Sequence, residues 1–324
     1  MRIALFFSAA SLSGAFSGLL AAAIQQMDGI RGIRGWQWIF ILEGLFTVCF
    51  GLFSYAMLPN SPESVMTFST KHKEHCLRRL QSDANLFESE KVTLRKVLSV
   101  FKDMHVLLIG AILFSNGVCL FGLAYFSPSI VQAMGYSNTR TQLMTVPPYA
   151  VAFVLTMITA YIADRYRQRG ISAFVTTCLA LVGAAMMLTG RSIAVRYVAL
   201  ILLLTGIYAT APCLISWVPN NTAGHVRRAT AVAFAFVSTS SGGVLSTWIY
   251  PKSSAPYYNL GARFNLALIV ITLVGLVAQV CLLRWLNREK EARRAEILNG
   301  LEDMSYEEQF EVLGDKHPSY QYTY

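Results

Sequence analysis

The sequence predicts an all-α polytopic membrane protein with about eight transmembrane helices, and two observations carry that prediction. Of the 324 residues, 54% are hydrophobic and only 14% are charged, whereas soluble domains average about 25% charged residues. The 27 Lys and Arg and 18 Asp and Glu are also clustered, since 14 of them lie in residues 60–103 and 15 in residues 284–324. The rest of the chain has the composition of a lipid-embedded protein.

This composition argues against a soluble enzyme, a nucleic-acid-binding protein and a disordered chain. The net charge of +9 belongs to loops and not to one continuous basic face. The sequence has no G-x-x-x-x-G-K-[ST] run of an ATP-driven pump, and its spans hold no His, Asp and Glu cluster suited to a metal or an acyl-transfer enzyme. We therefore expect neither an enzyme nor a cofactor.

Eight segments are apolar over the about 20 residues that a helix needs to cross a bilayer core roughly 30 Å thick. They are predicted at residues 3–24, 37–58, 105–131, 142–163, 172–189, 196–218, 229–250 and 265–286. They are predicted as helices because a backbone in lipid must satisfy its own hydrogen bonds, and the sequence lacks the alternating pattern of barrel strands. With a cytoplasmic N-terminus the inside carries 20 Lys and Arg and the outside 7. We therefore expect both termini in the cytoplasm.

The first span contains Gly14 and Gly18, and the seventh contains Gly242 and Gly243. Small residues let membrane helices approach closely, so we predict helix packing at these positions. In a protein that works by rocking, the same contacts would also be sliding surfaces. Each of the two spans follows a cationic residue, which indicates an internal repeat offset by six spans.

Glu43 lies a few residues inside the second span, and an ionisable side chain within a membrane indicates function. It is a candidate for proton coupling, and the alternative is a structural partner or a buried hydrogen bond. The polar insertion at 59–104 follows, with a predicted helix at 71–80, and its mixed charges favour a solvated amphipathic linker. No metal site is expected at its histidines, because structural zinc needs four ligands and no second pair lies nearby.

The third span combines Asn116, Tyr125 and Pro128, and broken helices of this kind tend to line midplane binding sites. Asn116 and Tyr125 lie on opposed faces of a regular helix, so both cannot point at one cavity. We favour Tyr125, and Tyr208 in the sixth span is a weaker candidate for the same cavity. The alternative is a hydrogen bond between helices.

A very short turn that contains Asp164, Arg165 and Arg169 joins the fourth and fifth spans. A carboxylate at a helix end, followed by guanidiniums, can pair with a neighbouring helix in one conformation and release it in the other. Arg227 and Arg228 are expected at the cytoplasmic end of the sixth and seventh spans. We predict a gate from these five residues; the alternative for the turn is positive-inside charges flanking a hairpin.

The stretch AYIADRYRQR at 160–169 resembles the loop signature G-x-x-x-D-R-x-G-R-R of the major facilitator superfamily, from which it departs at Ala160, Arg167 and Gln168. Further stretches resemble the fungal anion:cation symporter family, the allantoate and nicotinate permease group. They are GWQWIFILEG at 35–44, PSIV at 128–131, MGYS at 134–137, QLMTVPPYA at 142–150, WVPNNTAGHVRR at 217–228 and DKHPSYQY at 315–322.

The resemblance covers essentially the whole chain, as spans five to twelve of twelve. It implies the last two helices of an N-terminal bundle at 1–58, a cytoplasmic central loop at 59–104, a C-terminal six-helix bundle at 105–286 and a cytoplasmic tail at 287–324. It also implies a secondary active transporter of the plasma membrane, one that couples protons to the symport of a small organic anion (a carboxylate, ureide or vitamin) by rocker-switch alternating access.

Four spans would then be missing, so we expect this chain alone to be an incomplete, inactive fragment. The alternative is a membrane-embedded binding or regulatory subunit that associates with an intact transporter.

Overall fold

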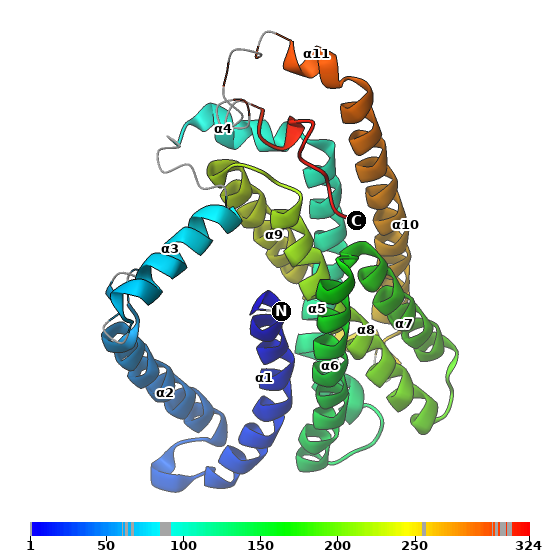
Figure 1. The fold of residues 1–324 in the computed structure, drawn as a ribbon. Coiled ribbons are helices and arrows are strands. Elements are labelled where there is room, and N and C mark those ends of the chain that lie inside the picture. Colours follow the sequence, from blue (N-terminus) through cyan, green and yellow to red (C-terminus); the bar gives the residue numbers. More distant parts are fainter. Residues whose placement is uncertain are drawn as a thin grey trace. The chain divides into compact units, whose positions relative to one another are not determined.

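The computed structural model describes residues 2–59, 61, 64–65, 68–84, 92–254, 257–299, 301, 304, 309 and 313–324. The chain divides into two compact units, Met1–Leu19 with Lys91–Tyr324, and Leu20–Glu90. The described residues form helices and turns, with no strand among them. Figure 1 shows the helices in chain order.

Among the described residues, eight helices are long and apolar enough to cross a membrane. They lie in α1 (Arg2–Ile24), α2 (Gly35–Met57), α5 (Met104–Gln132), α6 (Asn138–Tyr166), α7 (Arg169–Thr189), α8 (Ile193–Asn220), α9 (His225–Ser246) and α10 (Asn259–Ala292). The shorter elements are α3 (Thr70–Ala84), α4 (Leu94–Ser99), α11 (Arg294–Leu298) and the 3₁₀ turns η1 (Gln25–Met27), η2 (Ile30–Gly32), η4 (Val100–Lys102), η5 (Lys252–Ser254) and η6 (Gly314–Lys316). Both the number of predicted spans and the linker helix are confirmed.

Several predicted boundaries differ from the structure by a few residues, most clearly in the last two helices. The seventh helix was expected to reach residue 250 but ends at Ser246. Pro251 follows this end, and a proline disfavours helical backbone at the residue before it. The eighth helix is longer than its apolar segment and continues to Ala292, so it carries charged residues beyond the apolar stretch. The predicted tail therefore begins as helix.

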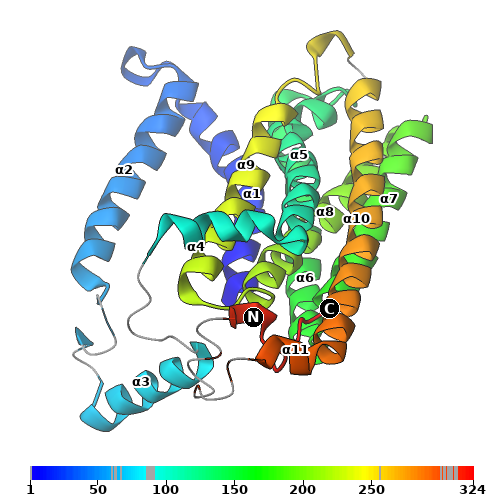
Figure 2. The same ribbon diagram turned by 90° about the horizontal axis from the view of Figure 1, so that it is seen from above.

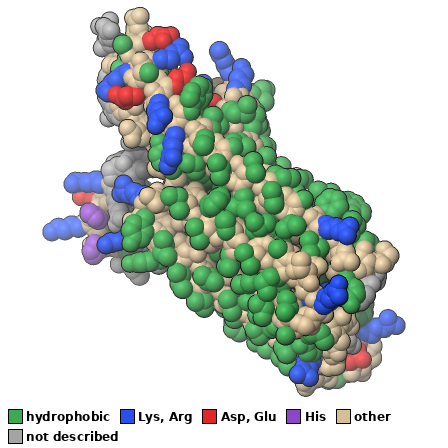
Figure 3. Space-filling view, turned by 90° about the vertical axis from the view of Figure 1, so that its right-hand side faces the viewer, with side chains coloured by type: hydrophobic (Ala, Val, Ile, Leu, Met, Phe, Trp, Pro, Cys, Tyr) green, Lys and Arg blue, Asp and Glu red, His purple; other side chains and the backbone are tan. Residues whose placement is uncertain are grey.

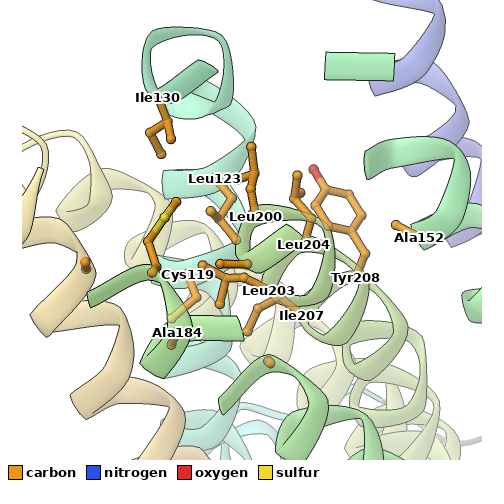
Figure 4. Close-up of a cluster of buried hydrophobic side chains, with 14 of the residues drawn as sticks. Cys119, Leu123, Ile130, Ala152, Ala184, Leu200, Leu203, Leu204, Ile207 and Tyr208 are labelled. Atoms are coloured by element: carbon orange, nitrogen blue, oxygen red, sulfur yellow. The ribbon is translucent and has the colours of Figure 1, made fainter. Parts of the chain in front are cut away.

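In the larger unit, α8 is the most buried helix and packs against α6, α7, α5 and α9. Its apolar side chains meet those of its neighbours in a core that includes Leu200, Leu203 and Leu204 (Figure 4). Thr210 holds two threonines of α7 by side-chain hydrogen bonds, at 2.7 Å from Thr176 and 3.2 Å from Thr177. Polar groups buried at a helix interface are stabilised when they pair in this way.

Glycines bring two pairs of helices into backbone contact. A Cβ atom on Gly206 of α8 would lie 2.5 Å from the backbone nitrogen of Ala180 in α7. Gly117 of α5 and Gly242 of α9 face each other's helix in the same way, and a Cβ on either would overlap backbone atoms. Figure 2 shows α5 beside α9 and α10. The prediction of close packing did not include Gly117 or Gly206.

The flank formed by α7 and α10 is apolar over the length of the bundle, with charged side chains towards its two ends (Figure 3). Large exposed hydrophobic side chains on these two helices are Ile171, Phe174, Val175, Val182, Val270, Ile271, Val274 and Val277. A soluble monomer rarely exposes so large an apolar surface. This belt is the surface that hydrocarbon would cover.

The smaller unit contains α2, α3 and the turn before α2. The Asp28 carboxylate accepts a 2.6 Å hydrogen bond from the backbone N–H of Gly35, which satisfies a free donor at the start of α2. The predicted linker helix at 71–80 lies within α3. Residues 85–91 of the linker lie outside the described residues.

Candidate functional site

The fold buries a pair of tyrosines between α6 and α8. The rings of Tyr149 and Tyr208 meet edge to face, with centroids 5.6 Å apart and an interplanar angle of 89°. Both side chains are buried, and Figure 4 shows the Tyr208 ring in the neighbourhood of Ala152 of α6. Gly14 of α1 lies against the other side of the pair, because a Cβ there would be 2.8 Å from the Tyr149 ring. Tyr149 is thus a residue that the sequence reasoning missed.

The other two cavity candidates lie in different surroundings. Asn116 is 1% exposed, and neither atom of its amide has a hydrogen-bond partner among the described residues. Tyr125 is 56% exposed and stacks on Phe121 with ring centroids 6.0 Å apart. The two side chains therefore lie in the different environments that their spacing predicts for opposed faces.

The turn between α6 and α7 closes with an ion pair. Arg169 Nη2 donates to Asp164 Oδ1 at 3.0 Å, with the two side chains 17% and 31% exposed. Arg165 is exposed and is not part of this pair. Arg167 follows α6 and has a left-handed backbone conformation, with φ at 55°. The loop signature of the major facilitator superfamily has glycine at this position. Of the predicted gating residues in this turn, the structure brings two together.

Among the described residues, the largest ionic cluster surrounds Arg227 at the start of α9. Its guanidinium pairs with Asp103, the residue before α5, and with Asp315 Oδ1 in η6 at 3.0 Å. The Asp315 side chain is 1% exposed and that of Asp103 is 10% exposed. Arg228 instead donates to the backbone oxygen of Thr222 at 3.2 Å. A partly buried guanidinium between two carboxylates is the arrangement that can offset the desolvation of all three.

The C-terminal segment docks on the bundle beside this cluster. Trp217 Nε1 donates to the carbonyl of Thr323 at 2.8 Å, and the Thr323 N–H donates to Asn221 Oδ1 at 2.7 Å. Tyr322 donates its hydroxyl proton to Asp315 Oδ2 at 3.0 Å. Burial, and then the negative charge of Asp315, raise the pKa of Tyr322 above its ordinary value, so this hydroxyl remains a donor.

Further contacts tie the segment to α7 and α10. Asn287 exchanges two hydrogen bonds with the backbone of Tyr322, at 3.0 and 2.9 Å. The Arg169 N–H donates to the carbonyl of Tyr324 at 3.0 Å. Lys290 donates to the carbonyls of Asp315 and Tyr320. The docked segment thus connects the ends of α5, α7, α8, α9 and α10.

The sequence reasoning missed this docking, together with Asp103 and Asp315. The signal was present, because the stretch DKHPSYQY at 315–322 and Asn221 were both recognised as family motifs. A motif in a tail beyond the last span indicates that the tail has a fixed contact. The partner of each motif residue is not readable from the sequence, since contacts such as Asp103 with Arg227 join distant positions.

The remaining candidates are two glycine pairs and one carboxylate. Gly18 faces α6, because a Cβ there would be 2.9 Å from the backbone oxygen of Gln142. Gly243 faces the ring of Phe121, because a Cβ on Gly243 would be 2.7 Å from that ring. Glu43 is exposed on α2, and its backbone carbonyl accepts a 2.7 Å hydrogen bond from the Thr47 hydroxyl. Among the described residues no group of three or more His, Cys, Asp and Glu could hold a metal ion.

A bundle of long apolar helices, with an apolar flank and charges gathered at its ends, defines a multi-pass integral membrane protein. Residues 1–247 match the Major Facilitator Superfamily, and the chain belongs to that family. The members of this family are membrane transporters of small molecules and not enzymes.

Fungal transporters are among the most similar relatives. The chain is 33% identical over 291 residues to an uncharacterized transporter of Schizosaccharomyces pombe, covering 90% of the chain and 58% of the relative. It is 32% identical over 330 residues to the high-affinity nicotinic acid transporter of Saccharomyces cerevisiae, covering 100% of the chain and 60% of the relative. It is 30% identical over 282 residues to an MFS transporter of a fungal species, covering 86% of the chain and 57% of the relative. The chain thus spans less than two thirds of the length of these relatives.

Proposed function

We propose that this protein is a secondary active transporter that carries a small organic anion together with protons by alternating access. The observation that carries the proposal is the 32% identity, along the whole chain, to a protein named for nicotinic acid, which is a small carboxylate. Because the chain covers 60% of that relative, the activity is proposed for the chain completed to the relative's length. The same proposal divides the chain into the last two helices of an N-terminal bundle at 1–58, a central loop at 59–104, a C-terminal bundle at 105–286 and a tail at 287–324.

Anion recognition is assigned to Tyr208 and Asn116, with Tyr125 as the exposed alternative. The buried amide of Asn116 supports this assignment, because an unpaired polar group in the core destabilises a protein unless a ligand or water satisfies it. The Tyr208 hydroxyl is a neutral donor in an apolar site. Such a donor would strengthen an interaction with an anion.

Gating is assigned to the ionic contacts at the α6–α7 turn and around Arg227. The pair of Asp164 with Arg169 links two helices, and Arg227 links α5, α9 and the docked segment. Ion pairs between elements that move are suited to a bistable gate, since each state can satisfy a different partner. Arg165 and Arg228 would serve as partners for the opposite state.

Proton coupling is assigned to Glu43, an ionisable side chain in an apolar helix. Helix packing is assigned to Gly14, Gly18, Gly242 and Gly243. We place the protein in the plasma membrane. The end of the larger unit that carries the docked C-terminal segment is placed in the cytoplasm. The excess of Lys and Arg on the predicted inside supports this orientation.

The test is uptake of radiolabelled nicotinate by yeast that lacks its own nicotinate carrier. Two proteins are expressed. One is the chain alone, and the other is the chain joined to the first four spans of the nicotinic acid transporter. The joined protein is expected to accumulate the label faster at external pH 5 than at pH 7.5, and a protonophore should remove the difference. Uptake by the joined protein that does not depend on pH would reject proton coupling, and no uptake of any tested carboxylate would reject the function.

Glu43→Gln in the joined protein tests the coupling residue. Accumulation driven by a pH gradient should disappear, whereas exchange of labelled for unlabelled substrate should continue, because exchange needs no net proton movement. Glu43→Asp keeps a carboxylate and serves as the control. If the Gln variant loses exchange as well, Glu43 is a structural residue instead.

A further inference from the structure

A pocket of 610 Å³ lies at the end of the bundle where α10 changes from apolar to charged. Its walls come from the start of α5, the last turns of α10, α11 and the C-terminal segment. Figure 2 shows α11 and the C-terminus at this same end of α10. Its volume lies within the range of small-ligand sites, about 300–1,000 Å³. The contacts of Arg227 described above lie beside the pocket and do not fill it.

One side of the pocket is cationic. Its positive lining residues are Lys102, Lys290, Arg293 and Lys316. Its carboxylates, Asp103 and Glu289, are engaged already, since Asp103 pairs with Arg227 and Glu289 accepts from Arg293 at 3.2 Å. The described lining therefore has an excess of positive charge.

Two of these cations remain available to a ligand. Lys102 is exposed and makes no ion pair with any described residue. Lys316 is 66% exposed and stands 4.0 Å from Asp103, which is the limit of an ion pair. An anion in the pocket could therefore reach both ammonium groups without breaking a strong contact.

Another part of the pocket lining is apolar and exposed. Trp285 is 57% exposed and Met104 is 66% exposed, and both line the pocket together with Leu282. Leu282 and Trp285 lie on α10 just before its charged last turns, and a tryptophan at such a level is typical of the membrane interface. A free phosphate ion would gain nothing from this wall, whereas a molecule with an anionic head and an acyl chain would contact both sides.

We propose that this pocket binds the phosphorylated headgroup of an anionic membrane phospholipid, with Lys102 and Lys316 contacting the phosphate and Trp285 contacting the glycerol and upper acyl chain. Basic pockets at the cytoplasmic side of membrane helices suit such headgroups. The bound lipid would join α5, α10 and the docked C-terminal segment. The site is independent of the substrate and proton sites proposed above.

Binding is tested on the purified full chain in detergent by native mass spectrometry. The probe is dioctanoyl phosphatidylinositol 4-phosphate, and dioctanoyl phosphatidylcholine is the neutral lipid. Lys102→Gln with Lys316→Gln should weaken phosphoinositide binding about 25-fold, since each surface cation contributes roughly a factor of five to anionic lipid binding. Arg288→Gln is the matched control, because Arg288 is exposed on α10 beside Glu289 but does not line the pocket.

Equal weakening by Arg288→Gln, or no weakening by the double variant, would overturn the proposal. Inositol 1,4-bisphosphate, which is the headgroup without chains, separates lipid from soluble phosphate. It is expected to bind at least tenfold more weakly than the lipid, because it cannot use the apolar wall. If it binds as tightly as the lipid, the pocket is a site for free organic phosphates and the lipid assignment is wrong. This readout needs no transport, so it is unaffected if the proposed function fails.

Discussion

Arg227 shows how one half-buried side chain organises an end of the bundle. Removing a guanidinium from water costs free energy unless carboxylates and hydrogen bonds surround it. Here the carboxylates are Asp103, which precedes Arg227 in the sequence, and Asp315, which follows it. Such a cluster contributes less to net stability than its geometry suggests, because desolvation offsets the attraction. Removing one member is nevertheless damaging, since it leaves the others buried without compensation.

Asp315→Asn tests this arrangement. The amide keeps the shape of the side chain but removes the charge, so we expect a loss of about 3 kcal/mol in the free energy of unfolding. Trypsin should also cut faster after Lys316 as the segment undocks. Glu296→Gln at the exposed pair with Arg293 is the control and should leave both measurements unchanged. An intact segment in the Asn variant would mean that the aromatic contacts alone hold it.

Arg167 carries a left-handed backbone conformation that disfavours any residue with a Cβ. Arg167→Gly should therefore raise the free energy of unfolding by about 1 kcal/mol. The same change two residues earlier, Arg165→Gly, lies within the right-handed helix and should lower stability. Thermal unfolding in detergent measures both, and a drop for Arg167→Gly would show that its side-chain contacts outweigh the backbone strain.

His317 is expected to make docking of the C-terminal segment depend on pH. Burial, and then the nearby charges of Arg294 and Lys290, lower its pKa below the ordinary value of 6.5. Its Nδ1 accepts the N–H of Ser319 at 3.1 Å, so a proton on Nδ1 would break that contact. The undocked segment thus binds a proton more readily than the docked one, and docking is fully stable above pH 6.5 and weakens as the pH falls below it.

The check is thermal unfolding of the wild type and of His317→Gln between pH 8 and pH 5. The variant lacks the titrating group, so the advantage of the wild type should shrink as the medium becomes more acid. Parallel curves over this range would contradict the assignment to His317.

Among the elements, α5 and α9 are joined by a crossing that only glycine permits. A Cβ on Gly242 would overlap the backbone of α5, which cannot move aside as a side chain can. At Gly122, on the same pair of helices, the nearest atom is on the Tyr250 ring at 3.1 Å. A methyl group would therefore meet backbone at the first site and a side chain at the second.

Gly242→Ala should lower the free energy of unfolding by about 2 kcal/mol, as overpacking of a tight interface does. Gly122→Ala introduces the same methyl group and should cost less than about 1 kcal/mol. Denaturation in detergent compares the two variants. Equal losses would indicate that the backbone crossing does not set the effect, and a gain at both sites would indicate the higher helix propensity of alanine.

For the whole molecule, the proposed cycle requires the pair of Asp164 and Arg169 to break and re-form. In the chain completed to the length of its relatives, Asp164→Asn should slow transport about tenfold, the size of a typical coupling between states, with surface expression intact. Asp164→Glu restores the charge and should recover most of the rate. Unchanged transport by the Asn variant would reject the gate.

The sequence by itself determined the class of protein and the number of its spans. Lipid cannot satisfy backbone hydrogen bonds, so a run of about 20 apolar residues has one stable solution, and that information is local. The positions of Asp164, Arg169 and Arg227 at helix ends followed from the same reasoning. The extension of α10 and the early end of α9 did not follow from the sequence. Beyond a span, the backbone conformation of charged and turn residues depends on the residues that they contact in the fold.

Only the tertiary structure decided which charges pair and which aromatic residues meet. Asp103, Arg227 and Asp315 come from three distant parts of the chain, and Tyr149 reaches Tyr208 across two helices. Pairing of this kind depends on how the helices cross, and the crossings depend on glycines such as Gly117 and Gly206 whose partners lie in other helices. The physical reason is that desolvated charges and close-packed rings are stabilised by specific neighbours, and neighbours in space are a property of the folded chain.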